Sequence, residues 1–332
     1  MPAPICLIVN PAAGGGRAAR VAPAAERALR DLGLSVRRVD TRHLPHAREL
    51  AGEAARAGET VVGLSGDGLL GVLADTLRLL PGTVLGVIPG GRGNDLARVL
   101  GIPDDPAGAA AIIAAGYTRP VDLGLVESEG SGAPAQAFVG IASAGFDSDA
   151  NRIANEAPAW LGGLVYLYGA LRALAAFRPA RFEIEFDPPG ERRSFTAFSV
   201  GAANSKTYGG GMRAAPGALL DDGLLEVMVV EYVGKVRFLT RILPKVFSGT
   251  HVHEPGVHVF RAAEIALSAD RPFVMYADGD PIGELPLRVR ALRGAVTMLV
   301  PRAGAADPAF AAGVAQVPPD APAPPDAPVA EA

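Results

Sequence analysis

The sequence predicts an α/β protein of two domains: an N-terminal doubly wound α/β domain and a C-terminal antiparallel β-sandwich domain. Three apolar runs of strand length, 5–9, 60–64 and 84–88, each end in a glycine-rich loop and continue into a helical pattern. In an open parallel sheet, loops at the carboxyl ends of the strands share one crevice, in which ligands bind. After residue 126, strand-like runs follow one another with few helices between them, which is typical of a sandwich.

The first 126 residues alternate strand and helix patterns, which predicts βαβ units. The first helix pattern ends at Gly33, a residue that commonly terminates helices. Helical spacing of apolar residues covers 17–32, 44–57, 94–100 and 106–115, and a further strand pattern covers 34–39. We therefore expect residues 1–126 to form one nucleotide-binding domain.

Residues 127–302 are predicted to form the second, β-rich domain, and the sequence leaves open whether its last strands return to the first domain. Helix patterns interrupt it near 150–177 and 234–248. The strand-like runs are 136–142, 181–187, 194–201, 224–231, 257–260, 263–268, 273–277, 286–291 and 295–300. The tail 303–332 is rich in Ala, Pro and Asp and nearly free of large apolar residues, which predicts disorder.

Composition excludes several classes of protein. Of the 332 residues, 49% are hydrophobic and 20% charged, as in a globular protein with a sizeable core. The net charge of −4 argues against nucleic acid as the main partner. The single cysteine, Cys6, cannot form a disulfide within the chain, and no stretch of about 18 residues is free of charge and strongly apolar. These features predict a cytoplasmic protein.

The loop after the second apolar run, residues 65–68, has the features of a phosphate turn. It reads Ser65-Gly66-Asp67-Gly68 and opens a helical pattern, so free backbone N–H groups would point at an anion. Its glycines allow a close approach of the backbone, and Asp67 places one carboxylate in the turn. Alone, a Gly-Asp-Gly tripeptide is most often a surface turn, but three such loops at one sheet edge favour a nucleotide site.

Three blocks carry a resemblance to a known family: Asn10-Pro11 with Gly14, residues 65–68, and residues 89–98, which read PGGRGNDLAR. They resemble the conserved blocks of the diacylglycerol kinase catalytic domain family, which includes sphingosine and ceramide kinases and, more distantly, NAD kinases. The resemblance implies an ATP- and Mg²⁺-dependent lipid kinase with the two-domain architecture of NAD kinase and diacylglycerol kinase.

The resemblance also implies which residues contact the nucleotide. Thr41 falls in a block similar to one whose threonine touches nucleotide in the family, although it could simply begin a helix. Arg92 stands where the family usually has a small hydroxyl residue, and its guanidinium could grip phosphate or point into solvent. The predicted ATP-binding residues are Asn10, Thr41, Ser65, Gly66, Asp67, Gly68, Gly91, Arg92 and Asn94.

Two acidic turns in the second half resemble functional blocks of the family. Asp222, with the backbone carbonyls of Leu219 and Leu224, corresponds to a structural magnesium site; the alternative is a plain hairpin turn. Asp280 ends the tripeptide Asp278-Gly279-Asp280, where the family has Asp-Gly-Glu, and the resemblance implies that it is the catalytic base. Asp67 is then the second catalytic residue and organises a catalytic Mg²⁺.

The chain departs from the family pattern around the phosphate turn. Leu69 stands where the family usually has Thr, Gly71 where it has Asn or His, and Val72 where it has Glu. Ser65 stands in place of a glycine. These departures leave open a nucleotide- or lipid-binding protein with reduced turnover, and the shared Gly-Asp-Gly turn leaves open an NAD kinase.

The resemblance implies phosphorylation of diacylglycerol to phosphatidic acid, with a sphingoid base or another lipid as alternative. The partner is then a lipid presented at the membrane surface, with peripheral association at the inner membrane surface and a possible homodimer. The apolar stretch 160–177 could line a lipid cavity or simply be core.

Overall fold

The computed structural model describes residues 3–128, 134–156, 165–187, 190–302 and 309–311. The N-terminal domain contains a parallel sheet in the order β4-β3-β1-β2. Its strands are β1 (Ile5–Val9), β2 (Val36–Asp40), β3 (Thr60–Ser65) and β4 (Val84–Pro89). β1, β3 and β4 are almost wholly buried, as expected for strands covered on both faces.

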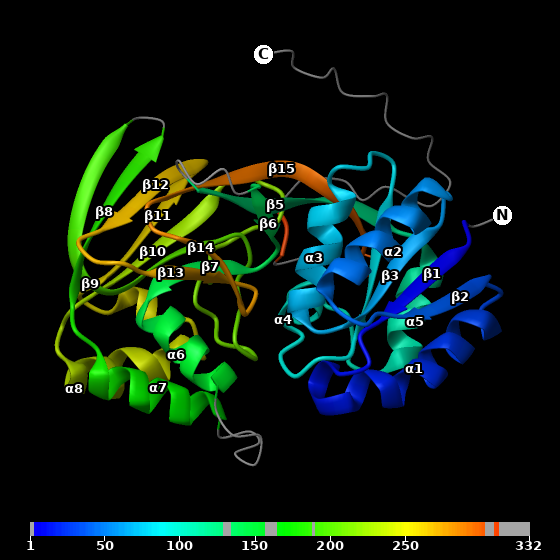
Figure 1. Ribbon diagram of the computed structural model, residues 1–332, viewed down its shortest axis with the longest axis horizontal. Helices are drawn as coiled ribbons and strands as arrows, with labels where there is room; N and C mark the ends of the chain where they lie inside the picture. Colours follow the sequence, from blue (N-terminus) through cyan, green and yellow to red (C-terminus); the bar gives the residue numbers. More distant parts are fainter. Residues whose placement is uncertain (1–2, 129–133, 157–164, 188–189, 303–308, 312–332) are drawn as a thin grey trace.

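Helices cover both faces of this parallel sheet, as the alternating pattern predicts (Figure 1). α1 packs beside α5, and α2 packs beside α3. The helices are α1 (Ala13–Asp31), α2 (Leu44–Arg56), α3 (Asp67–Leu77), α4 (Asp95–Val99) and α5 (Pro106–Ala115). The carboxyl ends of β1, β3 and β4 therefore all deliver their glycine loops to the same edge, which faces the second domain.

Two long strands, β5 (Thr118–Ser128) and β15 (Leu287–Leu299), run between the domains (Figure 1). They pair antiparallel along most of their length, and the end of β15 pairs parallel with β4 through Thr297 and Val84. The predicted strands 286–291 and 295–300 are thus one strand, with an irregularity between Leu292 and Val296. This strand carries the chain back into the first domain.

The second domain is built from antiparallel strands, and the predicted sandwich class is confirmed. β9 organises it: its first half pairs with β8, and its second half pairs with β7 and β10. The other strands are β6 (Gln136–Phe138), β7 (Ile141–Gly145), β8 (Ala180–Asp187), β9 (Glu191–Ala203), β10 (Leu225–Glu231), β11 (Val257–Ala262), β12 (Glu264–Ala269), β13 (Val274–Ala277) and β14 (Asp280–Glu284). β14 had no counterpart among the predicted strands, because Asp-Pro-Ile-Gly-Glu has no apolar alternation.

Helical segments cover one side of this domain. The single helix predicted near 150–177 corresponds to α6 (Phe146–Glu156) and α7 (Val165–Ala176), and Trp160 lies outside the described residues. The pattern at 234–248 forms α8 (Lys235–Arg237), a π-helical turn η2 (Phe238–Ile242) and α9 (Leu243–Val246), followed by the 3₁₀ turn η3 (Thr250–His253). An aromatic cluster of Phe146, Phe177, Phe198 and Phe238 holds these segments against the sheet.

The expectation of disorder throughout 303–332 is wrong for Ala309–Ala311. Ala309 and Phe310 are buried, and the Phe310 ring lies 3.9 Å from the guanidinium carbon of Arg119. The Ala311 N–H donates to Asp221 at 2.7 Å. The composition of the tail gives no sign of these contacts, in which the buried Phe310 ring, the Ala309 carbonyl and the Ala311 N–H each have a partner in the folded domains.

Candidate active site

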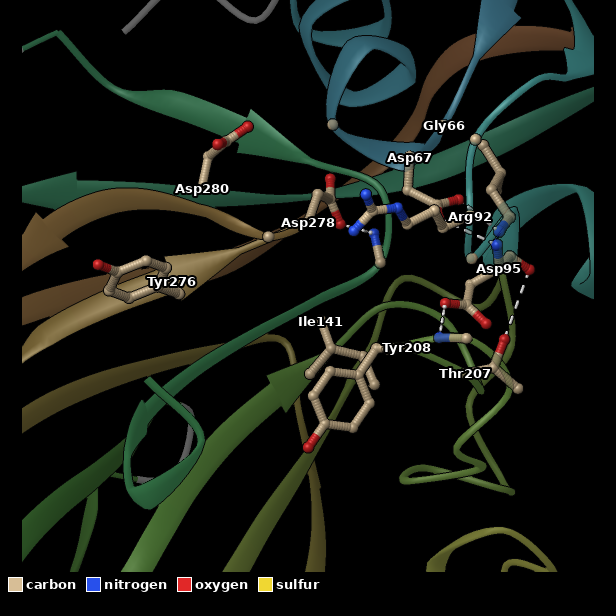
Figure 2. A pocket seen from close by; sticks show the side chains of 18 of the residues that line it. Gly66, Asp67, Arg92, Asp95, Ile141, Thr207, Tyr208, Tyr276, Asp278 and Asp280 are labelled. Carbon is tan, nitrogen blue, oxygen red and sulfur yellow. Dashed lines mark hydrogen bonds between the residues drawn. The ribbon is translucent and has the colours of Figure 1, made fainter. Parts of the chain in front are cut away.

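A cavity of about 780 Å³ lies between the two domains. The loops that follow β1, β3 and β4 form one wall, and the second domain forms the other through the start of β7 and α6, the loop 207–212 and the β13–β14 turn. Figure 2 shows the residues that face one another across it. The sheet edge that the sequence predicted as a binding crevice is therefore one half of an enclosed site.

The glycine loops pack backbone against backbone. A Cβ atom on Gly91 would lie 2.4 Å from the Cα of Gly66, and one on Gly14 would lie 2.6 Å from the carbonyl oxygen of Gly90. Real Cβ atoms do not approach other atoms so closely, so these positions exclude side chains. The glycines let three loops meet at one point, next to the first turn of α3, whose N–H groups have no acceptor within the helix and can bind an anion.

Asp67 is the first residue of α3, and its carboxylate reaches the third glycine loop. One oxygen accepts from the Asp95 N–H at 3.0 Å and the other from the Leu96 N–H at 2.9 Å. Asp67 thereby caps α4, since Asn94 at the cap position makes no such bond itself. Each oxygen keeps a second lone pair for a ligand, so the predicted metal role is compatible with this structural one.

Asp95 is a site residue that the sequence reasoning missed. It is buried, forms an ion pair with Arg98 at 2.7 Å, and accepts from the Gly210 N–H at 2.7 Å. Burial raises the pKa of Asp95, and the nearby charge of Asp67 adds to this effect. The bond to Gly210 joins the two domains at the cavity. The available signal was its place directly after Asn94 in a recognised block.

Asp278 belongs to the turn between β13 and β14. In the view of Figure 2 it lies between the carboxylates of Asp280 and Asp67. Its two oxygens accept from the N–H groups of Val139 and Gly140, both at 2.8 Å, and its backbone has a φ of 52°. Burial raises the pKa of Asp278 to about 7 against these bonds, and the charges of Asp67 and Asp280 raise it further.

Asp280, the predicted base, lines the cavity with a largely exposed side chain. One carboxylate oxygen would lie 3.1 Å from a Cβ atom on Gly68, so the missing side chain of Gly68 allows it to approach α3. Desolvation on the cavity side raises the pKa of Asp280. A carboxylate with a raised pKa and an open face has the properties of a general base.

Gly71, one of the departures from the family pattern, has a steric reason. A Cβ atom there would lie 2.7 Å from a carboxylate oxygen of Asp278. Any larger residue at position 71 would push Asp278 from the N–H groups that hold it. The glycine is therefore matched to the aspartate turn across the cavity.

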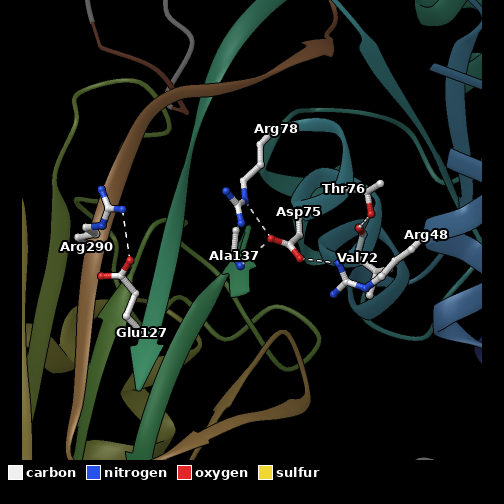
Figure 3. Close-up of polar contacts among 8 residues, drawn as sticks. All are labelled: Arg48, Val72, Asp75, Thr76, Arg78, Glu127, Ala137 and Arg290. Atoms are coloured by element: carbon white, nitrogen blue, oxygen red, sulfur yellow. Dashed lines mark hydrogen bonds and ion pairs between the residues drawn. The ribbon is translucent and has the colours of Figure 1, made fainter. Parts of the chain in front are cut away.

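Val72, where the family usually has glutamate, is buried and makes no polar side-chain contact. Three residues further along α3, Asp75 accepts from Arg48 at 2.5 Å and Arg78 at 2.9 Å, and also from the Ala137 N–H at 2.9 Å (Figure 3). Ala137 belongs to β6, so this buried carboxylate ties α3 to the second domain. Asp75 does not line the cavity.

The structure brings most of the predicted nucleotide residues together. Asn10, Ser65, Gly66, Asp67, Gly68, Gly91 and Arg92 all line the cavity. Thr41 and Asn94 do not line it: the Thr41 hydroxyl donates to the His43 carbonyl at 2.8 Å, and the Asn94 amide oxygen accepts from the Gly91 N–H at 2.8 Å. Their side chains shape the loops that contact the cavity.

Besides Asp278 and Asp280, the second domain contributes apolar side chains and one further acid, Asp147, to the cavity wall. Ile141, Phe146, Leu243 and Phe247 contribute to the wall. Burial raises the pKa of Asp147 to about 6, although hydrogen bonds with the side chains of Ser199 and Tyr208 oppose the shift. Asp147 was not predicted, because a carboxylate in the first turn of a helix is usually a surface residue.

At the predicted structural magnesium site, the guanidinium of Arg261 takes the place of the ion. One oxygen of Asp222 forms an ion pair with Arg261, and the other accepts from the Leu224 N–H at 3.0 Å. A cation coordinated by Asp222 and the carbonyls of Leu219 and Leu224 would have to displace the guanidinium, so this donor set does not fit the ion as arranged. Among the described residues, no group of three or more His, Cys, Asp or Glu side chains forms a metal site.

Glycine loops form one wall of the crevice, and carboxylates from a second, β-rich domain close it. This arrangement defines the class of two-domain kinases that includes NAD kinases. Residues 4–126 match the diacylglycerol kinase catalytic domain, and residues 140–300 match the YegS C-terminal NAD kinase beta sandwich-like domain. The chain belongs to the family of diacylglycerol kinase-like lipid kinases, and it is a lipid kinase. Membership of a kinase family implies the use of ATP.

Individual relatives agree with this assignment. The chain is 33% identical over 310 residues to a protein of Mycobacterium tuberculosis named diacylglycerol kinase, covering 90% of this chain and 96% of the relative. It is 30% identical over 312 residues to "Probable lipid kinase YegS-like" of Serratia proteamaculans, covering 90% and 95%. The crystal structure of a diacylglycerol kinase from Bacillus anthracis shares the fold, with a TM-score of 0.69, 23% identity and coverage of 90% and 97%.

Proposed function

We propose that the chain transfers the γ-phosphate of ATP to the free hydroxyl of diacylglycerol, giving phosphatidic acid and ADP. The observation that carries this proposal is the composition of the cavity: glycine loops and a helix N-terminus on one wall, carboxylates opposite them, and an apolar section beside both. Phosphoryl transfer needs positioning and charge stabilisation more than covalent chemistry, and such a cavity supplies both.

The phosphates would lie on the loops at Gly66–Gly68 and Gly90–Gly93, against the N-terminus of α3. The N–H groups of the first turn of α3, which have no acceptor within the helix, and the helix dipole favour negative charge there, whereas the N–H groups of Gly90 and Gly91 already donate to Ser65 and Asn94. Arg92 lines the same wall, with its Nη2 3.9 Å from the position of a Cβ on Gly15, so it lies between two of the loops. A guanidinium at this place would bind β- or γ-phosphate oxygens.

Asp280 is the better candidate for the base. Both oxygens of Asp278 already accept backbone N–H bonds, whereas Asp280 presents its carboxylate to the cavity. Asp280 would take the proton of the lipid hydroxyl while that oxygen forms a bond to the γ-phosphorus and the bond from the β–γ bridging oxygen breaks.

Magnesium would enter with the nucleotide, and Asp67 would help to hold it through its remaining lone pairs. Burial is the main cause of the raised pKa values of Asp95 and Asp278, and the charge of Asp67 raises both further; a divalent cation would relieve this second contribution. The ion would neutralise the charge that develops on the transferred phosphoryl group.

Diacylglycerol would place its acyl chains along Ile141, Phe146, Leu243 and Phe247. A sphingoid base is the second candidate, favoured by Asp147: a carboxylate beside this wall would pair with an ammonium group.

Transfer of radiolabelled phosphate from ATP to a panel of diacylglycerol, sphingosine, NAD and a lipid-free control tests the proposal. Label on NAD alone, or no label above the lipid-free control, would contradict it.

A further inference from the structure

The helical segment 235–247, made of α8, η2, α9 and Phe247, presents an unusual outer face. Val236, Leu239 and Phe247 are 77%, 37% and 60% exposed. Residues 232–253 contain Lys235, Arg237, Arg241 and Lys245 but no Asp or Glu. Apolar side chains interleaved with basic ones are the composition of a surface that lies on anionic membranes.

The inner face of the segment fixes the orientation of this outer face. Phe238 and Ile242 are buried, and the Phe238 ring stacks on Phe198 at 4.4 Å and meets Phe146 edge to face at 4.9 Å. Lys235 donates to the Ala175 carbonyl at 2.8 Å, which ties the segment to α7. The exposed apolar groups are therefore held outward on a packed helix.

Most of the basic side chains of this segment can bind an external anion. Lys245 is paired with Glu254. Within the part of the chain that the structure describes, Arg237 donates to the Pro255 carbonyl at 3.4 Å and has no ion-pair partner, and neither has Arg241. Both arginines, with Lys235, border a hollow that Glu254 also lines. Three cations against one already paired carboxylate favour an anionic group such as a lipid phosphate.

The same segment borders the catalytic cavity. Leu243 and Phe247 line that cavity, and Phe247 is also largely exposed. The side chain of Phe247 thus belongs both to the outer face of the segment and to the cavity wall. Within the described residues, no helix is long and apolar enough to cross a bilayer.

We infer that the segment 235–247 docks the enzyme on an anionic bilayer. Val236, Leu239 and Phe247 enter the headgroup region, Arg237 and Arg241 bind lipid phosphates, and the acceptor lipid enters past Phe247. The inference rests on the proposal that the cavity takes a lipid.

Vesicle co-sedimentation without ATP tests the docking directly. The fraction of the full chain that sediments is measured with vesicles of phosphatidylcholine alone and with vesicles of phosphatidylcholine mixed with phosphatidylglycerol. The variant Arg237→Gln/Arg241→Gln should lose about fivefold in partitioning per charge removed, about 25-fold in all, on the anionic vesicles. The variant Val236→Ser/Leu239→Ser should weaken binding to both kinds of vesicle, and added salt should weaken only the anionic component.

Controls with the same chemistry elsewhere are Arg192→Gln and Leu79→Ser, both exposed and on other parts of the molecule. These should bind as the wild type does. Turnover of an acceptor dispersed in detergent should be unchanged in the four docking substitutions, while turnover on vesicles falls with binding.

Equal partitioning of wild type and docking variants would overturn the inference. So would a wild-type dimer that the docking variants convert to monomer in vesicle-free sedimentation, since the surface would then be a subunit interface. If no lipid is phosphorylated but the variants still lose vesicle binding, the proposed reaction fails and the docking surface stands.

Discussion

Asp278→Asn tests the central feature of the site, a carboxylate held among other carboxylates. The pKa of Asp278 is raised from 3.8 to about 7, so the folded state retains its proton where the unfolded state has lost it. Between about pH 4 and pH 7 the native state binds more protons, and the free energy of unfolding must fall as the pH rises. The pKa difference corresponds to a loss of at most about 4 kcal/mol across this window.

The substitution should remove this pH dependence. At pH 4 to 5, Asp278→Asn should be less stable than the wild type by about 1 to 3 kcal/mol, because its amide NH₂ group faces a backbone N–H that the carboxyl oxygen accepted. The difference should shrink or reverse by pH 8, where the wild type carries the repelled charge. Urea denaturation at each pH, with the slope held common, measures the free energies.

A matched control is Asp31→Asn, an exposed aspartate at the end of α1. It should leave the pH profile of the wild type unchanged. If Asp278→Asn also keeps the wild-type profile from pH 4 to 8, Asp278 does not hold its proton, and the electrostatic reasoning about the site is refuted.

Four further substitutions test individual roles. Asp280→Asn should reduce kcat by about 100-fold or more with ATP binding retained; turnover near wild type would move the base elsewhere. Asp67→Asn should also lower kcat by about 100-fold, roughly 3 kcal/mol, and hydrogen exchange at the start of α4 should rise because the amide caps only one of two N–H groups; an unchanged rate and exchange would contradict both roles. Arg92→Thr should weaken ATP by about tenfold, more at low salt, in calorimetric titrations, and equal affinity in both buffers would place the guanidinium in solvent. For Asp222→Ala, a melting temperature that drops and loses a magnesium dependence seen in the wild type would support the metal prediction, whereas a small drop with no magnesium effect in either protein indicates the ion pair with Arg261 alone.

Gly71 and Val72, two of the residues at which this chain departs from the family pattern, each fit their surroundings in the structure. Gly71 gives Asp278 the space it occupies, and Val72 is buried in the core next to Asp75, which carries the negative charge of this face of α3. Positions 71 and 72 do not line the cavity, whereas Leu69, a third departure, does. Transfer of phosphate from ATP to the lipid panel measures whether these departures reduce turnover.

The sequence alone determined the N-terminal domain and half of the site. Its strands are short apolar runs that end in glycines, and the carboxyl ends of parallel strands necessarily meet at one edge, so Gly66, Asp67 and Gly91 could be placed together before any coordinates. The sequence also predicted a helix over 106–115, with the bounds that the structure has, and these bounds agree with Pro106 at its start and Gly116 after its end.

The tertiary structure decided what depends on partners distant in the chain. Asp278 lies opposite Val139 and Gly140, more than 130 residues away, and Asp95 bonds to Gly210 across the domain boundary. Phe310 is buried against the guanidinium of Arg119 while the next N–H, of Ala311, donates to Asp221, and β14 pairs with β13. Hydrophobic period and turn residues report only a residue's own neighbourhood, whereas burial, shifted pKa values and the choice between Asp278 and Asp280 arise from groups that folding alone brings together.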